Sequence, residues 1–99
     1  METRDLILIE NFCANHELEF SFIDSLHQFG LIEVIIHDDQ KCLHQEQLKE
    51  VEKMMRMHYE LDINMEGIDV ISHLLKRIDT LQHELRVTQN KLRLYENED

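Results

Sequence analysis

Apolar residues recur at alternating spacings of three and four through the last third of the chain. Read as one helix over residues 65–95, they form two rows along one face: Ile71, Ile78, Leu85 and Leu92 in one, and Leu74, Leu81, Thr88 and Tyr95 in the other. Such a heptad pattern, sustained over more than three repeats, is typical of a helix that pairs with another helix. No proline interrupts it, and at about 1.5 Å per residue the helix is roughly 46 Å long.

A helix of this length cannot bury its apolar rows against the shorter elements that precede it. The sequence therefore predicts a partner helix, most simply a second copy of the chain. The expected dimer interface consists of Ile71, Leu74, Ile78, Leu81, Leu85, Leu92 and Tyr95. The flanking charges leave a parallel and an antiparallel pair both open. The alternative is a long amphipathic helix that folds back on its own domain.

The first thirty residues predict a short strand and two short helices joined by a tight turn. The apolar run at residues 6–9 is typical of an edge strand, after which Ile9, Phe12 and Cys13 share one helical face. Gly30 directly follows a second helix over residues 19–29, at the usual place of a left-handed C-cap. The apolar side of that second helix contains Phe22, Ile23, Leu26 and Phe29. Two such helices are the outline of a helix-turn-helix.

A small wing and a third helix follow. Residues 31–36 are rich in β-branched side chains and predict a strand, residues 37–40 are turn formers, and residues 41–43 return as a second short strand. A third helix over residues 45–61 has an apolar face of Leu48, Val51, Met54, Met55, His58 and Leu61. Asn64 is the expected N-cap of the long helix. The sequence thus predicts two domains, at residues 1–63 and 64–99.

The charge balance narrows the class of partner. The 99 residues include 21 acids and 10 bases, a net charge of −11. Residues 1–39 alone carry nine acids against Arg4. Such a surface is a poor match to nucleic acid, whose phosphates must be neutralised by Lys and Arg. It suits either a partner protein with a basic surface or, as the plainer alternative, a solvated face that keeps the protein soluble.

Other kinds of chemistry have weaker support. Cys13, His16, Cys42 and His44 offer two sulfurs and two nitrogens, but the spacing within each pair is loose for zinc, and Cys13 also fits an apolar helix face. We expect no metal and no cofactor. No carboxylate is paired with a recognisable nucleophile, and two glycines make no phosphate loop, so we expect no enzyme activity. The absence of a signal peptide or apolar span, and only two cysteines, favour a cytoplasmic protein.

The order of these elements resembles that of the MerR-type winged-helix proteins. The segment FIDSLHQFGLI at residues 22–32 is similar to the second helix of that family and its Gly-Leu-Ile exit, and LDINMEGI at residues 61–68 is similar to the break before the family's next helix. More narrowly, the chain resembles the chaperone-modulator branch, the CbpM-type proteins. The shared features are ENFC at residues 10–13, the small size, and Gly67 and Ile68 before a terminal helix rich in Leu and Gln.

This resemblance covers nearly the whole chain. It implies a mainly α fold in which a MerR-like winged helix-turn-helix head, with a small two-stranded wing, precedes a long C-terminal dimerisation helix. It also favours antiparallel pairing of that helix. The CbpM-type resemblance further implies a partner, the J-domain of a DnaJ-like co-chaperone, which would be inhibited because the modulator competes with Hsp70 for a basic helix.

One departure from the wider family bears directly on function. DNA-binding members place Arg and Lys on the second helix and in the wing, whereas this second helix has no Lys or Arg, and the only Lys or Arg of the wing is Lys41. We therefore expect partner binding through an acidic surface made of Glu17, Glu19, Asp24, Asp38 and Asp39. The alternative is a MerR-like helix-turn-helix transcriptional regulator that binds DNA, and a third option is a dimeric adaptor with an unrelated partner.

Overall fold

The computed structural model describes residues 5–97 and contains four α-helices and three strands in that range. In chain order they are β1 (Leu6–Leu8), α1 (Ile9–His16), α2 (Phe20–Gln28), β2 (Ile35–His37), β3 (Gln40–His44), the 3-10 turn η2 (Gln45–Gln47), α3 (Leu48–Tyr59) and α4 (Met65–Glu96). The chain divides after Asp69 into two compact units. The prediction of a mainly α fold with a small wing and a long C-terminal helix is confirmed.

The strands form one antiparallel sheet in the order β1-β3-β2. Leu6 pairs with His44 on one side of β3, and Ile35 pairs with Cys42 on the other. The predicted two-stranded wing thus becomes a three-stranded sheet, because the apolar run near the N-terminus pairs with β3. Asp38 and Asp39 link β2 to β3 with φ angles of 50° and 61°. Two successive left-handed residues are the geometry of a two-residue type I′ hairpin turn.

The stretch between α2 and β2 is a loop rather than the predicted beginning of a strand. Gly30 has a φ of 74°, and the amide of Leu31 bonds to the carbonyl of Leu26 at 2.9 Å, which makes the left-handed helix end that the sequence predicts. The Gln47 side chain pairs with the backbone of this loop, as a neighbouring strand would. It accepts a hydrogen bond from the Glu33 amide at 2.7 Å and donates one to the Glu33 carbonyl at 2.9 Å.

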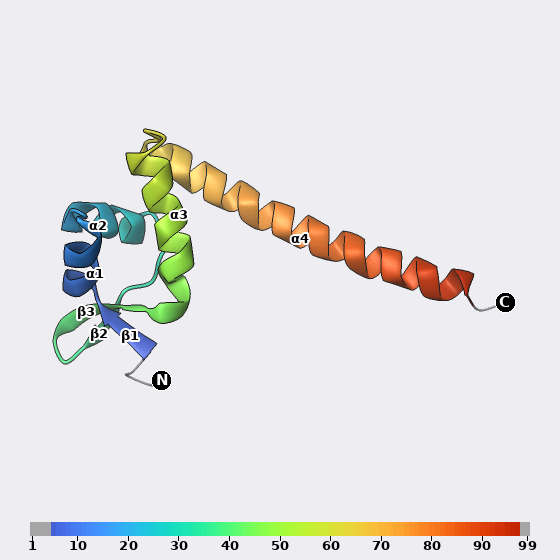
Figure 1. Ribbon diagram of the computed structural model, residues 1–99, viewed down its shortest axis with the longest axis horizontal. Coiled ribbons are helices and arrows are strands. Elements are labelled where there is room, and N and C mark those ends of the chain that lie inside the picture. The colour runs from blue at the N-terminus through green and yellow to red at the C-terminus, as the bar shows by residue number, and fades with distance from the viewer. Residues whose placement is uncertain (1–4, 98–99) are drawn as a thin grey trace. The chain divides into compact units, whose positions relative to one another are not determined.

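The core of the first unit lies between α1, α2 and α3, with the sheet at one end of the helices (Figure 1). Its buried side chains are Ile9, Phe12, Cys13, Phe22, Ile23, Leu26, Ile32, Leu43, Val51, Met54 and Ile68. Two residues assigned to apolar faces from the sequence are exposed. Phe29 follows the last turn of α2 and is 40 % exposed, and Leu61 lies beyond the end of α3 and is 66 % exposed.

Helix α4 begins as the sequence predicts. The Asn64 side-chain oxygen accepts a hydrogen bond from the Gly67 amide at 2.8 Å, so Asn64 is the N-cap. Ile68, in the first turns of α4, is fully buried in the core of the first unit. This explains why the two units divide after Asp69 rather than at the start of the helix, where the sequence analysis placed its domain boundary.

The second unit is the remainder of α4. Of the predicted interface residues, Ile71 is half-buried, while Leu74, Ile78, Leu81, Leu85, Leu92 and Tyr95 are exposed. Val70, Leu75, Val87 and Leu94 are exposed as well, so the apolar stripe is wider than two rows. Within residues 5–97 no helix combines the length and the apolar character needed to cross a membrane.

Candidate functional site

The outward face of α2 carries the first part of the candidate site. Helical spacing places Phe20, Asp24 and His27 together, while Phe22, Ile23 and Leu26 are buried. The carboxylate of Asp24 accepts a hydrogen bond from the Gln28 side chain at 3.0 Å. No Lys or Arg lies on this helix, so the face that α2 presents is apolar and acidic.

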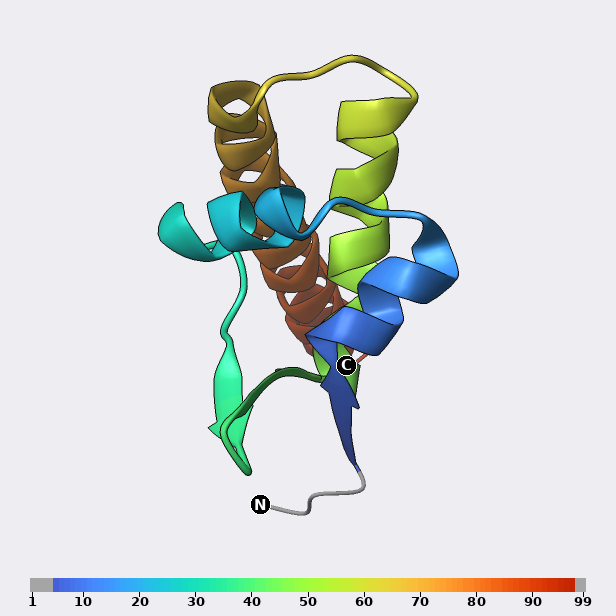
Figure 2. The same cartoon turned by 90° about the vertical axis from the view of Figure 1, so that its left-hand side faces the viewer.

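The β2–β3 hairpin supplies the second part, and Figure 2 shows it on the same side of the first unit as α2. A hollow of about 140 Å³ is lined by both elements, with Phe20, Asp24, Ile36 and Lys41 among its residues. A neighbouring hollow of about 240 Å³ is lined by Glu10, Phe20, Asp39 and Lys41, among others. Because the two hollows share Phe20 and Lys41, they form one continuous surface. We call it the α2–wing surface and define it by Glu10, Phe20, Asp24, Ile36, Asp39 and Lys41.

The chemistry of the α2–wing surface is apolar at its centre and negative at its edge. Phe20 is 45 % exposed and Ile36 is 62 % exposed, and because both line the same hollow they form a joined apolar patch rather than isolated exposed side chains. Lys41 is the only Lys or Arg between residues 5 and 48, and its ammonium lies 5.3 Å from the centre of the Phe20 ring. That cation–π contact directs the single positive charge inward, against Phe20. A DNA backbone would therefore meet carboxylates here.

The five acids predicted to bind a partner do not gather on one face. Asp24 and Asp39 belong to the α2–wing surface. Asp38 lies beside Asp39 in the turn, where its carboxylate is 3.4 Å from the Nε2 atom of His37. Glu19, at the N-cap of α2, lines a separate hollow with Phe22, His58 and Tyr59, and Glu17, at the C-cap of α1, lines another with residues of α3.

Sequence reasoning missed three residues of this surface. Glu10 stands in the first turn of α1 and lines the same hollow as Asp39. Phe20 and Ile36 are apolar but fall outside the buried stripes. The signal for Phe20 is its spacing: it lies four residues before Asp24, beside the buried stripe of α2 rather than within it. No comparable local signal marks Glu10 or Ile36, because their neighbourhood depends on how α1, α2 and the hairpin pack.

The cysteines and histidines considered as zinc ligands are not brought together. Cys13 is buried in the core, and burial raises the pKa of its thiol. His16 stacks on Phe12 with ring centres 4.2 Å apart, Cys42 is buried on β3, and the Nδ1 atom of His44 accepts a hydrogen bond from the Glu46 amide. Across the part of the chain that the structure describes, no three His, Cys, Asp or Glu side chains are arranged to hold a metal ion.

Comparison with known proteins identifies the family of the fold that carries this surface. The family model described as MerR HTH family regulatory protein matches residues 7–90. No curated protein and no solved structure gives a match. The matched range contains both helices of the helix-turn-helix, the wing, α3 and most of α4. The chain therefore belongs to the MerR HTH family of regulatory proteins.

Proposed function

We propose that this protein is a modulator of a DnaJ-like co-chaperone and that it inhibits the co-chaperone by binding its J-domain. The proposal starts from the MerR family, whose DNA-binding members use the second helix and the wing to contact DNA. Here those two elements carry carboxylates and exposed apolar side chains, and Lys41 is their only Lys or Arg. The sequence resemblance to the CbpM-type branch supplies the identity of the partner.

The α2–wing surface is the observation that carries the proposal. Phe20 and Ile36 provide apolar contact area, and Glu10, Asp24 and Asp39 surround it with negative charge. A basic helix with apolar residues between its Lys and Arg side chains would complement this pattern. The resemblance implies that a J-domain presents a basic helix to Hsp70, so a protein that covers this helix would compete with Hsp70 directly.

Binding to the isolated J-domain tests the proposal. We expect calorimetric titration with the J-domain of the co-chaperone from the same genome to show saturable binding that weakens as salt rises. The double variant Asp24→Asn with Asp39→Asn removes two charges, and Asn tolerates the left-handed backbone at residue 39. At about 0.2–1 kcal/mol for each exposed pair, its Kd should rise roughly two- to thirtyfold.

The matched control is Glu50→Gln, which removes an exposed carboxylate of α3 that contacts Lys53 and lines none of the hollows described above. It should leave the Kd unchanged. An absence of binding at low salt would refute the proposal. Equal affinities of the double variant and the native protein would refute the part played by the α2–wing surface.

The proposal includes a homodimer formed through α4. A helix that exposes a continuous apolar stripe gains little stability alone, and pairing would bury Leu74, Ile78, Leu81, Leu85 and Leu92. Two lysines at the middle of the stripe, Leu81→Lys with Leu85→Lys, should convert the protein to a monomer in sedimentation equilibrium. A double variant that still sediments as a dimer would place the interface elsewhere.

The second candidate function is a transcriptional regulator that binds DNA, which the family match over residues 7–90 favours. Its test is titration with random-sequence duplex DNA at several salt concentrations. A regulator of this kind neutralises several phosphates and loses affinity steeply with salt. We expect no binding even at low salt, because Lys41 is the only Lys or Arg at the α2–wing surface.

A further inference from the structure

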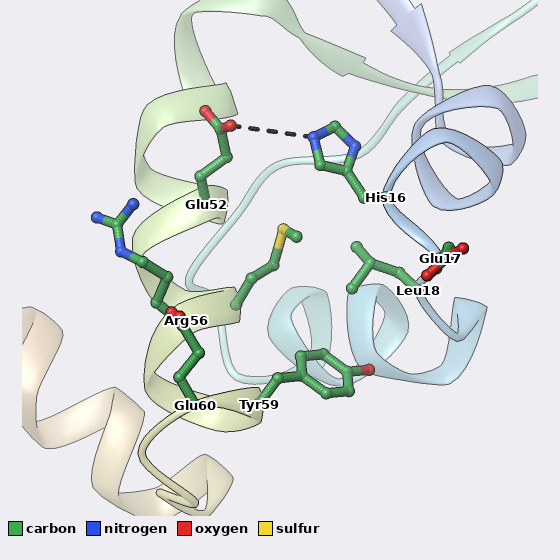
Figure 3. Close-up of a pocket in the computed structure, with 8 residues that line it drawn as sticks. His16, Glu17, Leu18, Glu52, Arg56, Tyr59 and Glu60 are labelled. Atoms are coloured by element: carbon green, nitrogen blue, oxygen red, sulfur yellow. Dashed lines mark ion pairs between the residues drawn. The ribbon is translucent and has the colours of Figure 1, made fainter.

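The hollow of the first unit that Glu17 lines lies between the end of α1 and α3. It has a volume of about 260 Å³ and shares no lining residue with the α2–wing surface. Its lining residues are His16, Glu17, Leu18, Glu52, Met55, Arg56, Tyr59 and Glu60 (Figure 3). Ligand sites for drug-sized molecules usually exceed about 300 Å³, so this pocket suits one side chain better than a cofactor.

The walls of this α1–α3 pocket are apolar and held in place. Leu18 and Met55 are half-buried and pack against the core. The Tyr59 ring is 51 % exposed, yet it contacts the Phe22 ring at 5.4 Å and the His58 ring at 4.9 Å between centres. These contacts hold the Tyr59 ring in place at the pocket. The flexible thioether side chain of Met55 lies in the same wall and can adapt to the shape of a bound group.

The rim of the pocket is negative. Glu17, Glu52 and Glu60 line it, and Figure 3 shows Glu17 beside Leu18 at the end of α1, with Glu52 and Glu60 coming from α3 and its end. The Arg56 side chain extends to the side of α3 away from His16 and Leu18. Glu17 and Glu60 are also the C-caps of α1 and α3, so two helices end at this pocket. Helix C-termini carry partial negative charge, which adds to that of the carboxylates.

Local stability does not explain the acid at residue 17. Glu17 has a φ of 55°, a left-handed conformation that Gly or Asn adopts more readily, and it stands at the negative end of α1. Glu19 differs from Glu17 in this respect. It stands at the N-cap of α2, where the positive end of the helix dipole favours a carboxylate. Glu17 is therefore an acid whose position points to a role outside folding.

We propose that the α1–α3 pocket receives a single basic side chain, lysine or arginine, of a protein partner. The apolar walls accommodate the alkyl stem, the Tyr59 ring lies against the cationic end, and the carboxylates of Glu17, Glu52 and Glu60 provide the opposite charge. The pocket is a second contact site beyond the α2–wing surface. It does not depend on the identity of the partner proposed above.

Amide chemical shifts of the ¹⁵N-labelled full-length protein test this assignment. The probes are three blocked peptides, acetyl-Gly-X-Gly-amide, with lysine, arginine or norleucine as X. Norleucine matches the lysine stem without its charge. We expect the lysine and arginine peptides to shift the amides of Leu18, Met55 and Tyr59 saturably, with a Kd of about 1 mM or weaker for a single side chain. The norleucine peptide should shift them at least several-fold less.

The variants Glu17→Gln and Glu50→Gln separate a specific site from general charge attraction. Glu17→Gln should raise the Kd of the lysine peptide about two- to fivefold, whereas Glu50→Gln should not change it. Equal effects of the lysine and norleucine peptides would overturn the proposal, as would small shifts spread evenly over all acidic regions. Shifts of Phe20 and Ile36 instead of Leu18 and Tyr59 would overturn this pocket while leaving the α2–wing surface in place.

Discussion

Replacement of Glu17 by glycine should stabilise the protein. The backbone of Glu17 has φ 55° and ψ 41°, and the amide of the next residue, Leu18, bonds to the Cys13 carbonyl at 2.9 Å. The turn thus requires a left-handed residue at this position. A side chain with a Cβ atom pays about 1–2 kcal/mol for that conformation, and glycine avoids the penalty.

The net gain is smaller than this penalty because glycine also gives the unfolded chain more freedom, by roughly 0.5–1 kcal/mol. We therefore expect Glu17→Gly to raise the free energy of unfolding by about 0.5–1 kcal/mol. For a domain of this size that corresponds to an increase in Tm of roughly 2–8 °C. Urea titration and thermal melts at matched protein concentration measure it, since any dimer would make stability depend on concentration.

The control is Glu17→Gln, which removes the charge but keeps the Cβ atom and the left-handed strain. If the backbone argument holds, the Gly variant is more stable than the Gln variant. A Gly variant equal to or less stable than the Gln variant would refute it. The Gly variant should also lose affinity for the lysine peptide, so that stability and binding change in opposite directions at one residue.

Three further changes have expected outcomes. Asp38→Asn with Asp39→Gly gives the β2–β3 turn the Asn-Gly pair that type I′ turns prefer. It should raise the free energy of unfolding by about 1 kcal/mol in urea titration. Gln47→Ala should lower it by about 1–2 kcal/mol, because both hydrogen bonds to the Glu33 backbone are lost. Burial raises the pKa of the Cys13 thiol, so the unfolded chain loses this proton at lower pH than the folded chain. Stability should therefore be full below about pH 8.5 and fall as pH rises towards the folded pKa, more than in Cys13→Ala.

The left-handed end of α2 and the start of α4 were predictable because their signals are local. Gly30 follows α2 at the position where the left-handed cap forms, and Asn64 precedes α4 where its oxygen meets the Gly67 amide. The Asp38–Asp39 turn likewise joins two adjacent strands. In each of these cases the residues that decide the structure lie within a few positions of one another.

The features that sequence reasoning missed involve contacts between distant residues. The pairing of β1 with β3 joins residues near the N-terminus to residues near position 43, and an apolar run alone does not name its partner. The bridge between Gln47 and Glu33 spans fourteen residues. The separation of the five predicted acids has the same origin. Their order along the chain places them close together, but the packing of α1, α2 and the hairpin directs Glu17 and Asp24 to different hollows.

Membership in the MerR HTH family and the acidic surface are compatible because different positions of α2 determine them. Phe22, Ile23 and Leu26 are buried and hold the helix in the fold, whereas Phe20 and Asp24 take no part in the buried core. A change of charge on the outward face therefore costs little stability. The buried spacing, which is what a family shares, stays intact whatever charge the outward face carries.

The distribution of charge between the two units is compatible with the proposed dimer, in which both first units would remain free to bind a partner. Residues 70–99 hold five acids and five bases, so the whole net charge of −11 belongs to residues 1–69. Two copies of α4 can approach without net repulsion, and their apolar stripes then decide the association. Two first units of the same sign repel each other within about 10 Å at moderate salt. Self-association through the acidic surfaces is thereby disfavoured, which leaves them accessible to a partner of opposite charge.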